Sequence, residues 1–191
     1  MKVLRAILPG VALVAVSAVM YAQSDMHKAG EKVTASEAEK SFTLLKTVAG
    51  TWQGTVTVDP PQAEMGTTQM QVSLRVTSRG NALVHEMKEA GSTDDPAKYD
   101  HPVTMFYLDS DRLLLTHYCD AGNRPRMVAR TTPDGKTVEF DFLDVAGGTQ
   151  FGHMHHAMFT IIDANHYIED WTYMMPGDKV VHARMDLKRA S

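Results

Sequence analysis

The segment QMQVSLRVT, residues 69–77, alternates polar and apolar side chains without interruption. A period of two places the apolar residues of this segment on one face of a β-strand and the polar residues on the other. The same alternation recurs at residues 137–142 and 181–188. These three segments therefore predict strands with one apolar face each, which is typical of antiparallel sheets.

Turn-forming residues divide the chain after Trp52 into further segments of strand length. Glycine, proline, asparagine, aspartate and serine mark nine turns, at residues 60–66, 80–81, 91–96, 109–111, 120–123, 133–135, 147–148, 163–165 and 176–178. Nine turns separate ten strands, and no intervening segment has the apolar spacing of a helix that could connect parallel strands. An open sheet of ten strands would leave two unpaired edges, so we predict an all-β, antiparallel up-and-down β-barrel.

One short helix precedes the strands. Ser36 and Glu39 have the spacing of a capping box, and Phe42, Leu45 and Val48 follow at helical spacing. We expect this helix to close one end of the barrel and residues 36–191 to form a single domain.

The first residues have the pattern of an export signal. Lys2 and Arg5 precede an apolar run at residues 7–20, and small residues at 22–24 suit signal peptidase. We predict a signal peptide at residues 1–24, a flexible spacer at 25–35, and a periplasmic or extracellular protein. An uncleaved membrane anchor is the alternative, but the run is shorter than the ~20 residues that a spanning helix needs.

Composition and motifs give no support for several classes of function. The formal net charge of −4 gives no basic face for nucleic acid, and Cys119 is the only cysteine, so no internal disulfide can form. No phosphate-binding loop, nucleophile elbow or zinc-protease motif is present. We therefore expect no cofactor, no nucleic-acid partner and, after signal cleavage, no membrane partner, while the oligomeric state stays open.

The sequence GTWQG at residues 50–54 resembles the start of lipocalins, fatty-acid-binding proteins and nitrobindins, which are calycin-type barrels. The chain is also similar to an uncharacterised bacterial lipocalin-like family, close to the domain of unknown function 1579 type. That similarity lies in the GTW start, in THYC at 116–119, in GNRPRM at 122–127 and in EDWT at 169–172, and it spans residues 42–188.

The resemblance to calycin-type barrels implies that Trp52 plugs one end of the barrel, with Arg184 or Arg189 laid across its ring. The bacterial family has no established activity, so the resemblance indicates a fold and leaves the ligand open.

Three strands have polar or aromatic residues on both faces, namely 113–119, 153–162 and 167–174. Because ligand cavities are mainly apolar with a few placed polar groups, we expect these strands to line a binding site in the lumen. The candidate ligand-binding residues are Trp52, His117, Cys119, His153, His155, Glu169, Trp171 and Tyr173. We predict that they bind a small, mainly apolar molecule.

A metal- or haem-binding barrel is the first alternative. His153 and His155 share a strand face, and His117 could supply a third ligand. The spacing from Gly147 resembles half of a cupin motif, but the expected glutamate is missing, so we favour a polar lining. His182 could bind haem by the nitrobindin resemblance, although its strand pattern points it outward.

An acid–base enzyme in the lumen is the second alternative. Glu169 and Asp170 lie on opposite faces of a strand, and we expect Glu169 to point inward beside Trp171 and Tyr173. A buried carboxylate is costly unless it has a partner, and His117, His155 or an arginine could provide one. With His117, Glu169 could form the acid–base pair.

Three further features each allow two interpretations. Cys119 could be a nucleophile beside His117, but a lone cysteine is more often buried packing. Arg124 and Arg126 could bind an anionic group at the barrel mouth or form a solvated hairpin end. The many methionines could line an adaptable lumen or simply fill the core.

Overall fold

The computed structural model describes residues 34–61, 68–95, 97–98 and 100–190 of the chain. The predicted signal peptide and spacer residues 25–33 lie outside these ranges. In the described part of the chain, no helix is long and apolar enough to span a bilayer.

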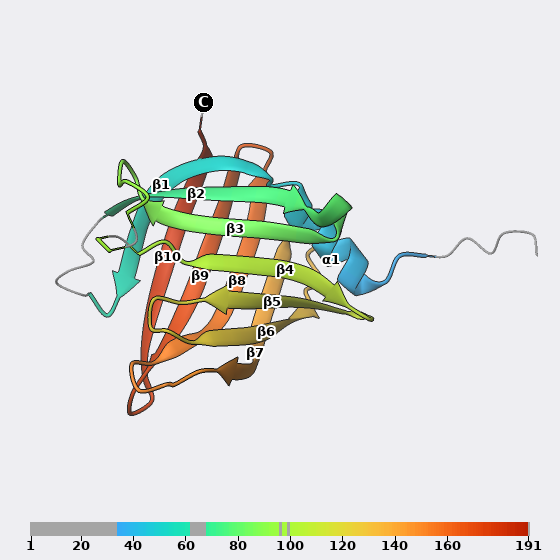
Figure 1. Ribbon diagram of the computed structural model, residues 1–191. Coiled ribbons are helices and arrows are strands. Elements are labelled where there is room, and N and C mark those ends of the chain that lie inside the picture. Colours follow the sequence, from blue (N-terminus) through green and yellow to red (C-terminus); the bar gives the residue numbers. More distant parts are fainter. Residues whose placement is uncertain (1–33, 62–67, 96, 99, 191) are drawn as a thin grey trace, which may run out of the picture. The chain divides into compact units, whose positions relative to one another are not determined.

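Ten strands follow one α-helix. The elements are α1 (Glu37–Lys46), β1 (Gly50–Asp59), β2 (Thr68–Thr77), the 3-10 turn η1 (Ser78–Gly80), β3 (Ala82–Glu89), β4 (Val103–Asp109), β5 (Arg112–Tyr118), β6 (Arg124–Thr131), β7 (Thr137–Ala146), β8 (His153–Asp163), β9 (His166–Met175) and β10 (Lys179–Arg189). Each strand pairs with the next, and β1 pairs with β10, so the sheet closes on itself (Figure 1). The predicted ten-stranded antiparallel barrel is confirmed.

Glycine at position 54 allows β1 and β10 to approach closely where the barrel closes. Gly54 pairs with Leu187 in the antiparallel register of these strands. A Cβ atom at Gly54 would lie 1.8 Å from the carbonyl oxygen of Asp186, closer than any side chain can come. The closing contact therefore requires glycine at this position.

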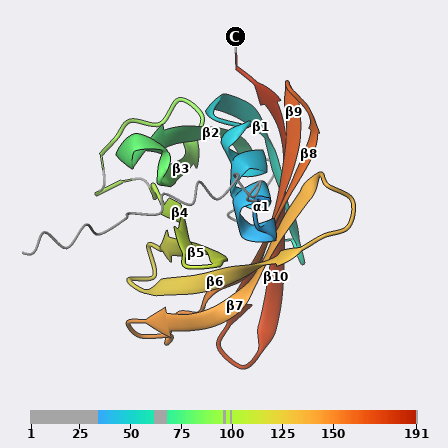
Figure 2. The ribbon, with the colours of Figure 1, turned by 90° about the vertical axis from the view of Figure 1, so that its right-hand side faces the viewer.

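The predicted helix forms with its predicted cap. The Ser36 side chain accepts a hydrogen bond from the Glu39 backbone N–H at 3.2 Å, and the Glu39 carboxylate accepts one from the Ser36 N–H at 2.7 Å. Phe42 and Leu45 are buried and belong to the barrel core. The helix lies across one end of the barrel, which we call the helix end (Figure 2).

Trp52 plugs the helix end as the family resemblance implied. Its side chain is buried, and its Nε1–H donates to the Val48 carbonyl at 2.8 Å. The Arg189 guanidinium lies 4.2 Å from the centre of the indole ring. Of the two arginines considered, Arg189 therefore covers Trp52, while Arg184 pairs with Asp170 at 2.8 Å.

Aromatic side chains fill part of the lumen. Phe106, Phe140 and Phe159 contact one another with ring centres 5.3 to 6.0 Å apart. The alternating pattern of β2 holds for Val72 and Leu74, which are buried, but fails for Val76, which is 39% exposed. Val76 lies near the end of β2, next to the 3-10 turn.

Candidate functional site

A cavity of about 590 Å³ lies inside the barrel, and we call it the lumen cavity. It is bordered by the second half of β1 at Val56, whereas Trp52 at the start of that strand plugs the helix end. Its wall is mainly apolar and contains five methionines, which are Met70, Met87, Met154, Met175 and Met185. They come from five strands, β2, β3, β8, β9 and β10. Methionine is flexible and polarisable, so this wall can adapt to the shape of an apolar ligand.

Most of the candidate residues on β5 and β9 line this cavity, namely His117, Cys119, Trp171 and Tyr173. Cys119 follows directly after β5. The structure therefore places these four residues at a cavity in the lumen. Trp52 does not line the cavity, because it fills the opposite end of the barrel.

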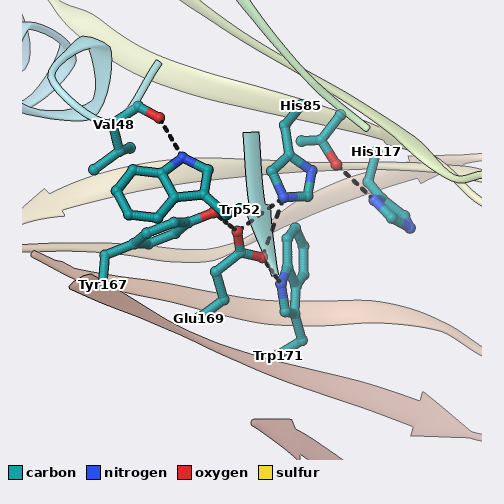
Figure 3. Close-up of polar contacts among 8 residues, drawn as sticks. Val48, Trp52, His85, His117, Tyr167, Glu169 and Trp171 are labelled. Atoms are coloured by element: carbon teal, nitrogen blue, oxygen red, sulfur yellow. Dashed lines mark hydrogen bonds and ion pairs between the residues drawn. The ribbon is translucent and has the colours of Figure 1, made fainter. Parts of the chain in front are cut away.

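His117 supplies a neutral polar group to the cavity wall. Only 1% of the residue is exposed, and its Nδ1 lies 2.8 Å from the Thr104 hydroxyl (Figure 3). Burial, together with the nearby His85, lowers the pKa of His117 to about 3. The imidazole is therefore uncharged at neutral pH. Among the described residues, its Nε2 atom has no hydrogen-bond partner.

Glu169 is buried behind the cavity wall and accepts hydrogen bonds from three side chains. Tyr167 donates its hydroxyl at 2.6 Å, Trp171 donates its indole N–H at 2.8 Å, and His85 Nε2 lies 2.9 and 3.1 Å from the two carboxylate oxygens (Figure 3). Burial alone would raise the pKa of Glu169. The charge of His85 and these hydrogen bonds outweigh that effect and lower the pKa of Glu169.

This cluster fixes the position of Trp171. The indole lines the cavity on one side and is tied to Glu169 on the other. Its ring also lies 5.4 Å from the ring of His117. Glu169 therefore acts on the cavity through Trp171, because its carboxylate is engaged by its three donors and the residue is not part of the wall.

The prediction that Glu169 points inward is confirmed, but its partner was missed. His85 lies on β3, between Leu83 and Met87 on the same strand face. That position in an apolar face was the available signal, because a histidine there must point into the core. No direct hydrogen bond joins His117 to Glu169, so the structure does not show the direct contact that the acid–base alternative would use. Each has its own partner, Thr104 for His117 and His85 for Glu169.

The structure does not support the alternative metal or haem set of His153, His155 and His117. His153 Nε2 lies 3.3 Å from His155 Nδ1, and both rings lie 4.8 Å from that of Phe142. Neither lines the lumen cavity with His117. A register shift between Met154 and His156 interrupts the alternation that the sequence interpretation assumed.

His156 and His182 also do not line the lumen cavity. In the part of the chain that the structure describes, Glu139, Asp141 and His156 form the one group of such side chains close enough to hold an ion. Arg130 pairs with both carboxylates of this group. His182 is exposed beside Thr172, which agrees with its outward strand pattern.

The cysteine has the character of a packed thiol. Burial, with the negative charges of Asp120 and Asp100 adding to it, raises the pKa of Cys119 to about 11. A thiol with so high a pKa carries almost no thiolate at neutral pH, so it is a poor nucleophile. The packing interpretation of Cys119 is therefore the one that the structure supports.

The predicted anion-binding arginines are not at the cavity. Arg126 Nε donates to Asp144 at 2.8 Å in an exposed ion pair, and neither Arg124 nor Arg126 lines the cavity. The charged groups that do line it are mainly acidic, namely Glu89, Asp100 and Asp120, with Lys98 as the basic one.

Comparisons with known proteins support the fold and leave the family undecided. No family model matches the chain, and no curated protein matches its sequence. The crystal structure of Rv2717c from M. tuberculosis is similar with a TM-score of 0.55 and 13% identity, over 79% of this chain and 98% of that one. A protein of unknown function from the DUF3598 family of Nostoc punctiforme shares 7% identity, over 78% of this chain and 99% of that one, at a TM-score of 0.22. At these identities the first likeness supports the barrel alone, and the second carries no argument.

Proposed function

We propose that this barrel binds a small, mainly apolar molecule in the lumen cavity. The observation that carries the proposal is a cavity of about 590 Å³ in a barrel whose other end is plugged by Trp52 and α1. Small-molecule sites are clefts of roughly 300–1,000 Å³ with apolar walls and a few polar groups. A barrel of ten strands leaves space for a ligand that eight strands barely provide.

Affinity in this site comes mainly from the burial of apolar surface. A ligand that buries about 200 Å² against the methionine wall gains about 5 kcal/mol, before the cost of losing its freedom of motion. The Nε2 atom of His117, which has no partner among the described residues, adds orientation, because a ligand can form a hydrogen bond with it. Trp171, held by Glu169, gives the wall one rigid aromatic face.

We further propose that the protein acts after export, in the periplasm or outside the cell. The N-terminal sequence that predicts a signal peptide supports this location.

A fluorescence titration tests the binding function. The neutral probe N-phenyl-1-naphthylamine brightens in an apolar site, and we expect saturable binding of one probe per chain. Ala183→Phe adds a ring at the cavity wall and is expected to abolish this binding. Ala146→Phe adds the same ring at an exposed position away from the cavity and is the matched control. Equal probe affinity in both variants would contradict the proposal.

A further inference from the structure

The mouth of the lumen cavity carries more negative than positive charge. Glu89, Asp100 and Asp120 line it, together with the single basic residue Lys98. The Lys98 ammonium lies 3.6 Å from Asp95, a carboxylate outside the lining, so its charge is already balanced. The acids of the mouth therefore create a negative potential at the entrance, and a cleft with low-dielectric walls strengthens such a potential.

Two of these acids repel each other. Desolvation at the mouth, together with the negative charge of Asp120, raises the pKa of Asp100 to about 6, although His101 acts in the opposite direction. Burial raises the pKa of Tyr173 to about 12, with smaller contributions from Cys119 and from the charge of Asp120. Asp120 therefore interacts electrostatically with both Asp100 and Tyr173, and all three residues line the cavity. A positive group placed among them would relieve the repulsion between the carboxylates.

The cavity below the mouth has features that suit the rest of such a ligand. Trp171 and Tyr173 offer aromatic faces, which attract cations as well as apolar groups. The methionines of the wall provide the apolar surface. Independently of the acids, the buried His117 lines this cavity with an Nε2 atom that has no partner among the described residues, which points to a ligand in the same space.

We propose that the ligand of the lumen cavity is an amphipathic organic cation. Its apolar body lies along the methionine wall, and its ammonium group lies at the mouth between Asp100, Asp120 and the Tyr173 ring. This inference rests on the proposed function and adds the chemical class of the ligand. It excludes fatty acids and other apolar anions as preferred ligands, because their carboxylate would meet the acidic mouth.

Competition with the bound naphthylamine probe tests the charge preference. Three competitors share one ten-carbon chain: decyltrimethylammonium, 1-decanol and decanoate, each used below the concentration at which it forms micelles. We expect the cation to displace the probe at a concentration about tenfold lower than decanoate, with decanol between them. The difference is expected to shrink at high salt, because Asp100 and Asp120 are only partly desolvated and salt still screens their charges.

Variants that lack these carboxylate charges test whether the preference for a cation comes from the mouth of the cavity. Asp100→Asn with Asp120→Asn removes two charges at the mouth and is expected to bring the cation and decanoate within about twofold of each other. Glu86→Gln with Asp111→Asn removes two exposed charges that do not line the cavity, so it controls for net charge. The control is expected to keep the tenfold preference.

The outcomes separate the two proposals. Displacement by all three competitors at equal concentration, or best by decanoate, would overturn the cation inference and leave the binding function intact. A preference that persists in the Asp100 and Asp120 variant would also overturn the inference. Failure of the neutral probe to bind at all would overturn the binding function, and the inference would fall with it.

Discussion

Replacement of Glu169 by glutamine is expected to destabilise the barrel substantially, although the two side chains have nearly the same shape. The Glu169 carboxylate receives hydrogen bonds from Tyr167, Trp171 and His85 in the barrel interior. A glutamine amide offers one acceptor oxygen in place of two. The Tyr167 hydroxyl can rotate and accept from the new NH₂ group, but the Trp171 indole N–H can only donate.

The magnitude follows from the loss of charge in these bonds. A hydrogen bond to a charged group contributes about 1.5–3 kcal/mol, against about 0.5–1.5 kcal/mol for a neutral one. Three bonds that each lose about 1 kcal/mol give a loss of about 3 kcal/mol, and removal of the buried charge returns part of it. We therefore expect Glu169→Gln to lower the free energy of unfolding by about 2–3 kcal/mol.

Urea unfolding monitored by far-UV circular dichroism measures this difference. Asp170→Asn is the matched control, because the neighbouring side chain faces outward and pairs with Arg184 in a largely exposed ion pair. We expect that control to change the unfolding free energy by less than about 1 kcal/mol. A Glu169→Gln protein as stable as the parent would show that the cost of burying the carboxylate equals the benefit of its hydrogen bonds, which would refute the reasoning.

Three further outcomes are expected from other parts of the molecule. Folding lowers the pKa of His117 to about 3, so between about pH 6.5 and pH 3 the unfolded chain binds a proton at this residue and the folded chain does not. The stability that the neutral histidine contributes is therefore complete above about pH 6.5 and is lost as the pH falls toward 3. Between pH 7 and pH 5 this histidine alone should cost about 2 kcal/mol of stability, and His117→Gln should flatten the pH profile of urea unfolding by that amount; an unchanged profile would contradict the assignment. Ser36→Ala removes the side-chain acceptor of the capping box and should cost about 1 kcal/mol in thermal unfolding, whereas an unchanged melting temperature would argue against the cap. Arg189→Ala exposes the Trp52 ring and should cost about 1 kcal/mol, whereas an equal loss in Arg112→Ala would argue against a specific role for the arginine over Trp52.

The fold was predictable because its signals are local. Alternation in β2, β7 and β10 and the nine turns are read from neighbouring residues, and the capping box of Ser36 and Glu39 spans only four. The family resemblance added the role of Trp52 at the helix end. Antiparallel strands joined by short turns leave few other arrangements, so the local pattern determined the closed barrel.

The site was less predictable because its contacts join distant strands. His85 and Glu169 are separated by 84 positions in the sequence, and their contact depends on how far each strand slides before the barrel closes. The break in β8 between Met154 and His156 has no signal in the sequence, so the histidines there were assigned to the wrong surroundings. Alternation shows which residues point inward, but not which of them meet.

The acidic mouth of the cavity was not predictable for the same reason, because its residues come from distant parts of the sequence. Glu89 ends β3, whereas Asp100 and Asp120 lie in two different connections between strands. Each of these acidic residues, taken alone, is of a type that is common in turns and at strand ends. Only the closed barrel brings the three carboxylates to one opening.

Xenon binding observed by X-ray diffraction tests the central claim most directly. Crystals of the protein under xenon pressure should show anomalous density in the lumen cavity, bounded by Met154, Trp171 and Met185. That result would show accessible apolar space where the account places the ligand. A cavity without xenon, with side chains occupying its volume, would contradict the account.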